Sequence, residues 1–433
     1  MLQVGAAETI ITPPIGTELA GWSFGPSVGI LDHLTAQALY VETDGQAAAI
    51  VTADVLGFGA DFVGRVRHRL ATSLGLCGES VLLAASHTHS GPAVAPLRQW
   101  GPPDADYVRL LESHLVGLVE AACRDARPAT ASATLGFVDG LNENRRSSDG
   151  RTDDDAPALR FDANTYGGSP IAVIYGFACH PVTLHTYGGL ISPDFPGYAR
   201  EAVRDALGAD TTVMFALGAC GDVNPKGYQA GRTTEARARD IGVALGDEVA
   251  RACLGARPTE PWDVRVSSTA LDLPVVPLPD LAELQSQHDE AAAEASRLSE
   301  EGAPWPAQSV AQIKRDWAQD AIAADRTVTT MPCEIQAMRI GSAALVAMPL
   351  EVFAETGIAI RESSPFDVTL LCTNANGAVG YLPTRDVYAT EHDYTHPSGL
   401  APKIYGLHTL GEEAEPMVRS AAIEALHAVH GDC

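Results

Sequence analysis

The stretch SVLLAASHTHSGP, residues 80–92, sets the pattern by which the rest of this chain can be interpreted. Its first half is a short apolar run, which is typical of a strand buried on both faces. The run ends in a turn that carries His87 and His89, followed by Gly91 and Pro92. Side chains two residues apart on extended backbone point to the same side, so both imidazoles can face one pocket.

Four further stretches repeat this pattern, in which a buried strand leads into a polar turn rich in Gly and Pro. They are IAVIYGFACHPVTL (171–184), TTVMFALGACGDVNP (211–225), AALVAMPLE (343–351) and VTLLCTNANGAVGYLPT (368–384). In open α/β sheets, ligands bind beyond the carboxyl ends of the strands. We therefore expect the five turns to converge on one site, although they lie far apart in the sequence.

The strands alternate with helix-like stretches, which predicts an α/β fold. Turns at Asp44-Gly45 and Gly341-Ser342 predict two hairpins, and helical periodicity appears near 61–75, 104–126, 194–207, 232–254 and from about 351. Strands that are apolar throughout indicate a large sheet with helices on both faces. No internal repeat or low-complexity linker interrupts residues 1–433, so we expect a single domain.

Residues 280–325 are expected to form a helical hairpin inserted into this body. Asp280 and Glu283 have the spacing of a capping box, which predicts a helix start. The segment GAPWP (302–306) separates the two helices. We expect the hairpin to have a structural role.

Composition and charge exclude several classes of protein. With 46% hydrophobic and 19% charged residues, the chain can bury a large core, so disorder is not expected. A formal net charge of −26 disfavours binding to nucleic acid or stable association with anionic membranes. The first residues lack a signal-peptide pattern, and no apolar run approaches the ~18–20 residues of a membrane span. The eight cysteines form no CxxC pair. We therefore expect a cytoplasmic protein.

The five turns carry residue types that bind zinc. A catalytic zinc has about three protein ligands and one open position, and imidazole is a common ligand. Candidates occur in four of the turns, namely His87, His89, His180, Glu351 and Tyr381. Each also has an ordinary structural interpretation, as a core histidine, a carboxylate at a helix start or a core aromatic residue. The HxH pair is not specific either, although the HxHxDH pattern of metallo-β-lactamases does not match this chain.

Taken together, these segments resemble the catalytic domain of the neutral/alkaline ceramidase family, whose members are zinc amidases. The resemblance also includes VGAAETIITPPIGTELAGW (4–22), DHLTAQALYVE (32–42), TADVLGF (52–58), NRR (144–146), SPDFPGYAR (192–200) and LEVFAETG (350–357). It implies one zinc ion per chain, held by His87, His180, Glu351 and Tyr381. It also implies that His89 contacts the reacting group and that an arginine of the NRR segment, Arg146, lies near the site.

The chemistry expected from this resemblance is hydrolysis of an amide by metal-activated water. His89 would shuttle a proton or stabilise the developing oxyanion, assisted by Arg146 and Tyr394. Asp54 and Asp222 are candidates for carboxylates that orient the metal-bound imidazoles. Two alternatives stay open. The same site could open a lactone or another ester, or the chain could be a non-catalytic, ligand-binding relative.

Three departures from the family pattern bear on the substrate. The family's GDVSP turn has Asn224 in place of its serine, and a YEG-like segment is replaced by EHDYTHPSG (391–399). The chain ends at residue 433, which leaves no room after Tyr381 for the C-terminal immunoglobulin-like domain of ceramide-cleaving members. We therefore expect the substrate to be a small, water-soluble N-acyl or cyclic amide rather than ceramide.

Overall fold

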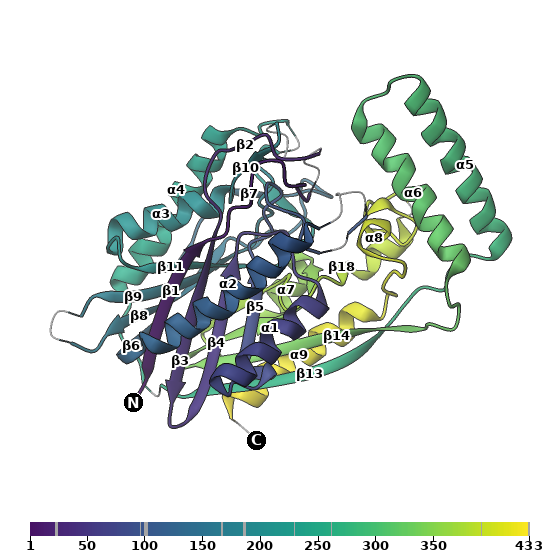
Figure 1. Ribbon diagram of the computed structural model, residues 1–433. Helices are drawn as coiled ribbons and strands as arrows, with labels where there is room; N and C mark the ends of the chain where they lie inside the picture. Colours follow the sequence, from purple (N-terminus) through teal and green to yellow (C-terminus); the bar gives the residue numbers. More distant parts are fainter. Residues whose placement is uncertain are drawn as a thin grey trace.

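The computed structural model describes residues 1–21, 25–95, 97–98, 103–165, 168–184, 188–228, 230–260, 262–390 and 392–431. In this part of the chain, two β-sheets stack face to face, and helices cover the outer face of each (Figure 1). The layers therefore follow the order helix, sheet, sheet, helix.

The larger sheet runs through the middle of the molecule. Among the described residues its eight strands have the spatial order β11 (Thr212–Leu217), β9 (Pro170–Phe177), β8 (Asp155–Ala163), β6 (Arg127–Phe137), β1 (Gln3–Ile10), β3 (Thr35–Thr43), β4 (Gln46–Ala53) and β5 (Val81–Ala85). The smaller sheet has the order β13 (Val264–Pro274), β14 (Thr330–Ile340), β15 (Ala343–Ala347) and β17 (Val368–Cys372). Three short pairs lie near the turns, namely β2 (Gly29–Ile30) with β10 (Leu190–Ile191), β7 (Asn142–Asn144) with β12 (Val223–Pro225), and β16 (Leu350–Val352) with β18 (Gly380–Leu382).

The helices divide between the two outer faces. The larger sheet is covered by α1 (Ala60–Leu74), α2 (Ala105–Arg124), α3 (Phe195–Leu207) and α4 (Glu235–Gly255). The smaller sheet is covered by α7 (Ala354–Glu362) and α9 (Ala414–His430). The remaining helical segments are η1 (Gly78–Ser80), α5 (Leu281–Glu300), α6 (Trp305–Ala323), η2 (Arg385–Ala389) and α8 (Leu400–Tyr405).

Alternate residues of each inner strand point to different apolar clusters. In β4, Ala48 and Ile50 face the second sheet, whereas Ala49 and Val51 face α1 and α2. Because both faces are covered, the strand is apolar throughout. The α/β class and the large sheet that the sequence predicts are confirmed. The helices lie on the two outer faces of a pair of sheets, and the inner face of the large sheet is covered by the second sheet.

The larger sheet consists of two four-stranded halves that share only a corner. Here β1 pairs with β6 through two positions alone, Gln3 with Pro128 and Val4 with Arg127. The strands of the two halves extend away from this corner. The outer strands β5 and β11 therefore need a further connection to bring their ends together.

The segment that follows β17 supplies this connection. The Thr373 N–H donates to the Leu217 carbonyl at the end of β11, at 2.8 Å. The Asn376 N–H donates to the Leu83 carbonyl in β5, also at 2.8 Å. The Asn376 side chain accepts the Leu83 N–H in return, at 3.0 Å. The ends of β5, β11 and β17 are thus fixed beside one another, which is the convergence expected from their turns.

Several local predictions are also confirmed, with one difference. Asp44 and Gly45 form the hairpin turn with φ of 51° and 79°, the left-handed region that such two-residue turns require. The expected helix at about 351 begins later, at Ala354. Glu351 lies in β16 and pairs with Tyr381 of β18. Its position is therefore set by a strand pair and not by a helix start.

The predicted helical hairpin is formed by α5 and α6 and projects from the body (Figure 1). The Asp280 carboxylate accepts the Glu283 N–H at 2.9 Å and caps α5, as the capping-box spacing predicts. At its base, the Trp317 indole donates to the Leu407 carbonyl at 3.0 Å. A cavity of about 790 Å³ lies between the hairpin and the body, and none of the candidate site residues lines it.

Two stretches singled out in the sequence extend beyond the described residues. Trp22, which ends the first ceramidase-like stretch, and Glu391, which begins EHDYTHPSG, lie outside them. Within the described ranges, none of the helices combines the length and the apolar character that crossing a membrane would require.

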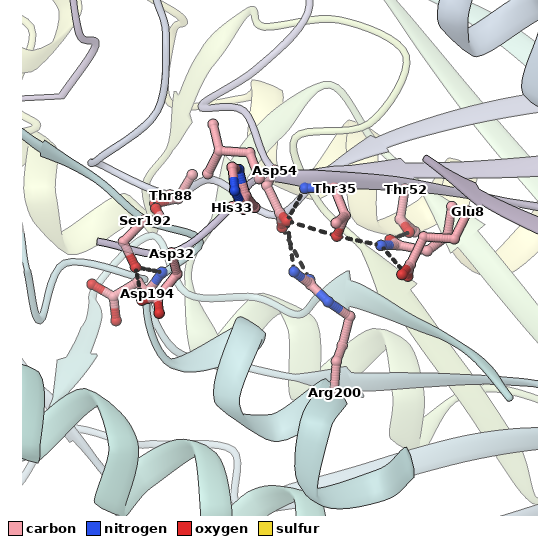
Figure 2. A network of polar contacts seen from close by, with 12 residues as sticks. Glu8, Asp32, His33, Thr35, Thr52, Asp54, Thr88, Ser192, Asp194 and Arg200 are labelled. Carbon is pink, nitrogen blue, oxygen red and sulfur yellow. Dashed lines mark hydrogen bonds and ion pairs between the residues drawn. The ribbon is translucent and has the colours of Figure 1, made fainter. Parts of the chain in front are cut away.

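A buried ion pair joins α3 to the end of β4 (Figure 2). The Arg200 guanidinium donates to both carboxylate oxygens of Asp54, at 3.0 and 2.6 Å. The side chains of Arg200 and Asp54 are 4% and 1% exposed, so neither charge can be solvated by water instead. Asp54 also accepts the Thr35 N–H at 2.9 Å. The pair therefore fixes α3 against two neighbouring strands.

Replacing Arg200 with Met should destabilise the protein by about 3–5 kcal/mol, because the Asp54 charge would stay buried without its partner. The free energy of unfolding, measured by chemical denaturation, checks this. Arg204→Met is the matched control on the same helix, since Arg204 pairs with Glu8 at a partly exposed position. It should cost less than about 1 kcal/mol. Equal losses in the two variants would contradict the role given to the buried pair.

Candidate metal centre

A cavity of about 350 Å³ lies where the five turns meet. Residues from every turn line it, together with others from four further segments: His87, His89, Arg145, Arg146, His180, Val182, Asn224, Tyr228, Glu351, Tyr381, Asp393, Tyr394, Thr395, Ile404 and Tyr405. All eight residues that the sequence singled out for catalysis or metal binding are among them. The structure thus brings the predicted set together, and their individual roles stay proposals.

His87 is held by the main chain that follows β4. Its N–H donates to the Val55 carbonyl at 3.0 Å, and its Nδ1 lies 2.7 Å from the Leu56 carbonyl oxygen. A carbonyl only accepts, so Nδ1 carries the hydrogen and Nε2 presents a lone pair. Burial lowers the pKa of His87 to about 4, although Glu351 opposes this effect. The ring is therefore neutral at pH 7, which is the form that binds metals.

His180 is oriented in the same way by a different turn. Its Nδ1 lies 2.6 Å from the Cys220 carbonyl oxygen and 3.2 Å from that of Val223. Nδ1 therefore carries a hydrogen, and Nε2 is the atom that faces the cavity. That atom lies 2.9 Å from Glu351 Oε2. Both imidazoles thus take their orientation from main-chain carbonyls.

Glu351 is fully buried between the two imidazoles and a tyrosine. Its Oε2 lies 3.7 Å from His87 Nε2, and its Oε1 accepts a hydrogen bond from the Tyr405 hydroxyl. Burial by itself would raise the pKa of Glu351, but the neighbouring His87 and His180 outweigh burial and hold the pKa at about 2. The side chain is therefore an ionised carboxylate at neutral pH.

This donor set fits a metal ion. His87 Nε2 is buried and has no hydrogen-bond partner among the residues that the structure describes. A lone pair on His180 Nε2 that faces a carboxylate oxygen at 2.9 Å is repulsive unless a proton or a cation lies between them. Two imidazole nitrogens and one carboxylate oxygen are ligands that zinc takes in catalytic sites.

Two ligand sets are compatible with the geometry, and both contain His87 and His180. In the first, His89 supplies a third imidazole, since the three histidines each have a ligand nitrogen within 4.8 Å of the other two. In the second, Glu351 and Tyr381 complete the set, as the sequence resemblance implies. Loss of metal from variants at His89 would distinguish the two sets.

Arg145 lies at the centre of the cavity beside Tyr381. Its guanidinium donates to the Gly221 carbonyl at 2.5 Å and lies 5.2 Å from the centre of the Tyr381 ring, whose own centre is 6.1 Å from that of Tyr394. Burial raises the pKa of the Tyr381 hydroxyl well above its ordinary value, while Arg145 acts in the opposite direction and is hydrogen-bonded to it. This arginine was not the one selected from the NRR segment.

Arg146, the arginine that was selected, lines the same cavity but is held by acidic residues at its edge. Its guanidinium donates to Asp393 at 2.6 Å and to Asp386 at 2.8 Å. These ion pairs hold the charge in place beside carboxylates. They connect the segment after β7 to residues 386–393, and the role of Arg146 in the site stays a prediction.

The prediction that Asp54 and Asp222 orient the imidazoles is wrong. Asp54 is engaged by Arg200, and Asp222 accepts the Ala354 N–H and the Asn144 amide, each at 2.8 Å. The orienting groups are the carbonyl oxygens described above. The two carboxylates instead hold the turns that carry these carbonyls. Asp54 directly precedes Val55, and Asp222 lies between Cys220 and Val223.

The remaining predicted residues complete the wall of the cavity. Asn224 is buried and belongs to β12, whereas Tyr394 lies at the rim with 36% of its surface exposed. The Arg145 guanidinium lies 5.7 Å from the Tyr394 ring centre. Tyr228 and Tyr405 also line the cavity and were missed, since neither occurs next to one of the strand-end turns.

Comparison with solved structures shows which fold this is. The chain is similar to the crystal structure of neutral ceramidase from Pseudomonas aeruginosa, with a TM-score of 0.74 and 20% identity over 99% of this chain and 74% of that chain. It is also similar to a ceramidase complexed with C2, with a TM-score of 0.73 and 18% identity over 99% of this chain and 75% of that chain. No family model matches the sequence.

These likenesses establish a neutral ceramidase-like fold. At 18–20% sequence identity, the similarity establishes the fold alone. The resemblance that the sequence motifs indicate is thus confirmed at the level of the fold.

Replacing His87 or His180 with Ala should remove both metal and activity, because each supplies a neutral imidazole that the main chain holds in place. His89→Ala should keep its zinc and lose about 10²–10⁴-fold in turnover, the usual span for a positioned proton-transfer group. Elemental analysis of protein never exposed to chelator, together with turnover, checks both statements.

His68→Ala, on the exposed face of α1, is the control and should change neither quantity. If His89→Ala lost its metal, His89 would be a ligand and the three-imidazole set would hold. Less than about half a zinc per wild-type chain would count against the metal centre itself.

Proposed function

We propose that this protein is a zinc-dependent hydrolase that cleaves the amide bond of a small substrate. The observation that carries the proposal is that the Nε2 atoms of His87 and His180 face one ionised carboxylate, that of Glu351, in a buried cavity. His87 Nε2 is buried without a hydrogen-bond partner among the described residues, and leaving a buried polar atom unpaired is costly unless a cation binds it.

The reaction class is supported by the similar structures. Both are named ceramidases, and a ceramidase hydrolyses an N-acyl amide. We propose the same bond type, an amide, for this chain, but we do not propose a lipid substrate. His87, His180, Glu351 and Tyr381 would hold the zinc, which when bound polarises a carbonyl oxygen and lowers the pKa of water.

Arg145 is the group best placed to stabilise negative charge on a reacting carbonyl. Its guanidinium donates to the Gly221 carbonyl, and the rings of Tyr381 and Tyr394 lie 5.2 and 5.7 Å from it. Its position is therefore fixed before a substrate binds. Preorganised donors of this kind stabilise a developing oxyanion without reorganisation.

His89 is placed to move a proton within the cavity. Its ring lies edge-on to those of His87 and His180, with centroids 4.9 and 5.8 Å away. Its main-chain N–H donates to the Pro181 carbonyl at 3.1 Å, which fixes the start of its side chain. Asn224 can donate and accept hydrogen bonds to a substrate amide, but it is not a nucleophile.

The size of the cavity favours a small substrate. At about 350 Å³ it lies near the lower end of the ~300–1,000 Å³ span of small-molecule sites. Four charged side chains line it, namely Arg145, Arg146, Glu351 and Asp393. We propose a water-soluble N-acyl or cyclic amide. The cytoplasmic location and the single-domain organisation expected from the sequence stay predictions.

Arg145→Lys should lower kcat by about 10²–10³-fold, because a single ammonium cannot reproduce the donor geometry of the guanidinium at the developing oxyanion. Arg146→Lys is the adjacent control and should change kcat by less than about tenfold, since its partners Asp393 and Asp386 can pair with either cation. Steady-state kinetics of the two zinc-loaded variants check this. A larger loss of kcat in Arg146→Lys than in Arg145→Lys would assign stabilisation of the oxyanion to Arg146 instead.

Short N-acyl amino compounds and cyclic amides should be hydrolysed with a higher kcat/KM than detergent-dispersed ceramides of several chain lengths. The reason is that the cavity is small for a long acyl chain and carries the charged side chains of Arg145, Arg146 and Asp393. Side-by-side kcat/KM values, with matched esters and lactones included, are the measurement.

A tenfold advantage of ceramide would overturn the substrate proposal and leave the metal centre intact. Faster turnover of esters or lactones would change the bond assigned to the site. A zinc-loaded wild-type protein that hydrolysed none of these compounds would contradict the hydrolase proposal.

A further inference from the structure

The two loops that carry the histidines are joined by a short connection between β10 and α3. We call Ser192–Asp194 the 192–194 clamp. Its main chain holds the first histidine loop at two points. The Thr88 hydroxyl donates to the Ser192 carbonyl at 2.7 Å, and the Ser192 N–H donates to the Ser90 carbonyl at 3.1 Å. These contacts lie on either side of His89.

The Asp194 side chain holds the second histidine loop. It is fully buried, and its Oδ2 accepts the N–H of Leu184 at 2.8 Å, four residues beyond His180. Its Oδ1 accepts the Phe195 N–H at 2.6 Å and caps α3. Figure 2 shows Asp194 and Ser192 beside Thr88, at the meeting point of these segments. One carboxylate therefore joins a helix start to the loop that follows His180.

The backbone of Asp194 indicates that capping is not its whole purpose. It has φ 60° and ψ −156°, a region that is almost confined to glycine. Two other aspartates cap helices with ordinary backbone angles, Asp104 with φ −68° and Asp280 with φ −65°. Capping thus does not require the strain. An L residue persists in this region only where surrounding contacts over-determine it.

We propose that Asp194 is a positioning residue for the metal centre, which holds the loops of His87–Ser90 and His180–Leu184 in register. The loops are also joined directly, since the His89 N–H donates to the Pro181 carbonyl at 3.1 Å. The 192–194 clamp adds a second connection, because Ser192 contacts Thr88 and Ser90 while Asp194 accepts the Leu184 N–H. The inference rests on the proposed function in so far as the loops are taken to hold zinc.

Substitution with Asn separates positioning from stability. Burial raises the pKa of Asp194 to about 6, although the N–H groups of Phe195 and Leu184 act in the opposite direction. An amide has no charge to bury, so Asp194→Asn should fold as well as the wild type. It has only one acceptor oxygen, however, and one of the two N–H groups loses its partner.

The first test uses metal-free protein and hydrogen–deuterium exchange. In Asp194→Asn, peptides that cover 87–92 and 180–184 should exchange faster than in the wild type, because the two loops are no longer fixed together. Asp194→Gly should do the same while relieving the backbone strain, and it covers the case in which the Asn variant folds poorly. Asp280→Asn, at a cap in the α5–α6 hairpin, is the matched control and should leave both peptides unchanged.

The second test is zinc affinity, measured by titration with zinc alone, and kcat with the amide substrate. Both Asp194 variants should bind zinc about 10–100-fold more weakly, with KM changed much less than kcat at saturating zinc. Their melting temperatures should differ from the wild type by no more than that of the Asp280 control.

Wild-type exchange and zinc affinity in both Asp194 variants would overturn the proposal, whatever the melting temperatures. A wild-type chain that bound no zinc would contradict the proposed function instead. The exchange experiment would then still decide whether Asp194 holds the two loops together.

Discussion

The buried ion pair between Asp54 and Arg200 is the interaction on which the candidate metal centre most depends. It fixes α3 against the end of β4, where the chain continues to Leu56, whose carbonyl orients His87. The same helix begins at Asp194, which holds the loop after His180. Because a buried charge that loses its partner costs several kcal/mol, the helix cannot shift along the sheet without a large loss of stability. Both histidine loops therefore take their positions from one helix.

The position of the candidate site could be predicted because its residues follow the most apolar strands. β5 and β9 are buried on both faces, and strands of this kind are recognisable as uninterrupted apolar runs. Polar residues placed directly after such runs must lie at the end of the sheet. This reasoning locates His87 and His180 without any knowledge of how the two halves of the sheet are joined.

Other features depend on tertiary contacts that the sequence does not display. The strands β6 and β13 are rich in Ala, Ser and Thr and partly exposed, so their alternation is weak and neither was predicted. Arg145 and Arg146 are adjacent in the sequence, but only tertiary contacts show that Arg145 binds the Gly221 carbonyl whereas Arg146 pairs with Asp393. Tyr405 reaches Glu351 only because α8 packs against β18.

The use of carbonyl oxygens to orient both imidazoles has a consequence for how this centre can change during evolution. Every amino acid offers the same carbonyl, so no point substitution at Leu56, Cys220 or Val223 deletes the group that holds a histidine. An insertion or deletion in either turn would move the carbonyl and rotate the ring. Leu56, Cys220 and Val223 are thus free to vary in side chain where packing allows, whereas the length of each turn is fixed.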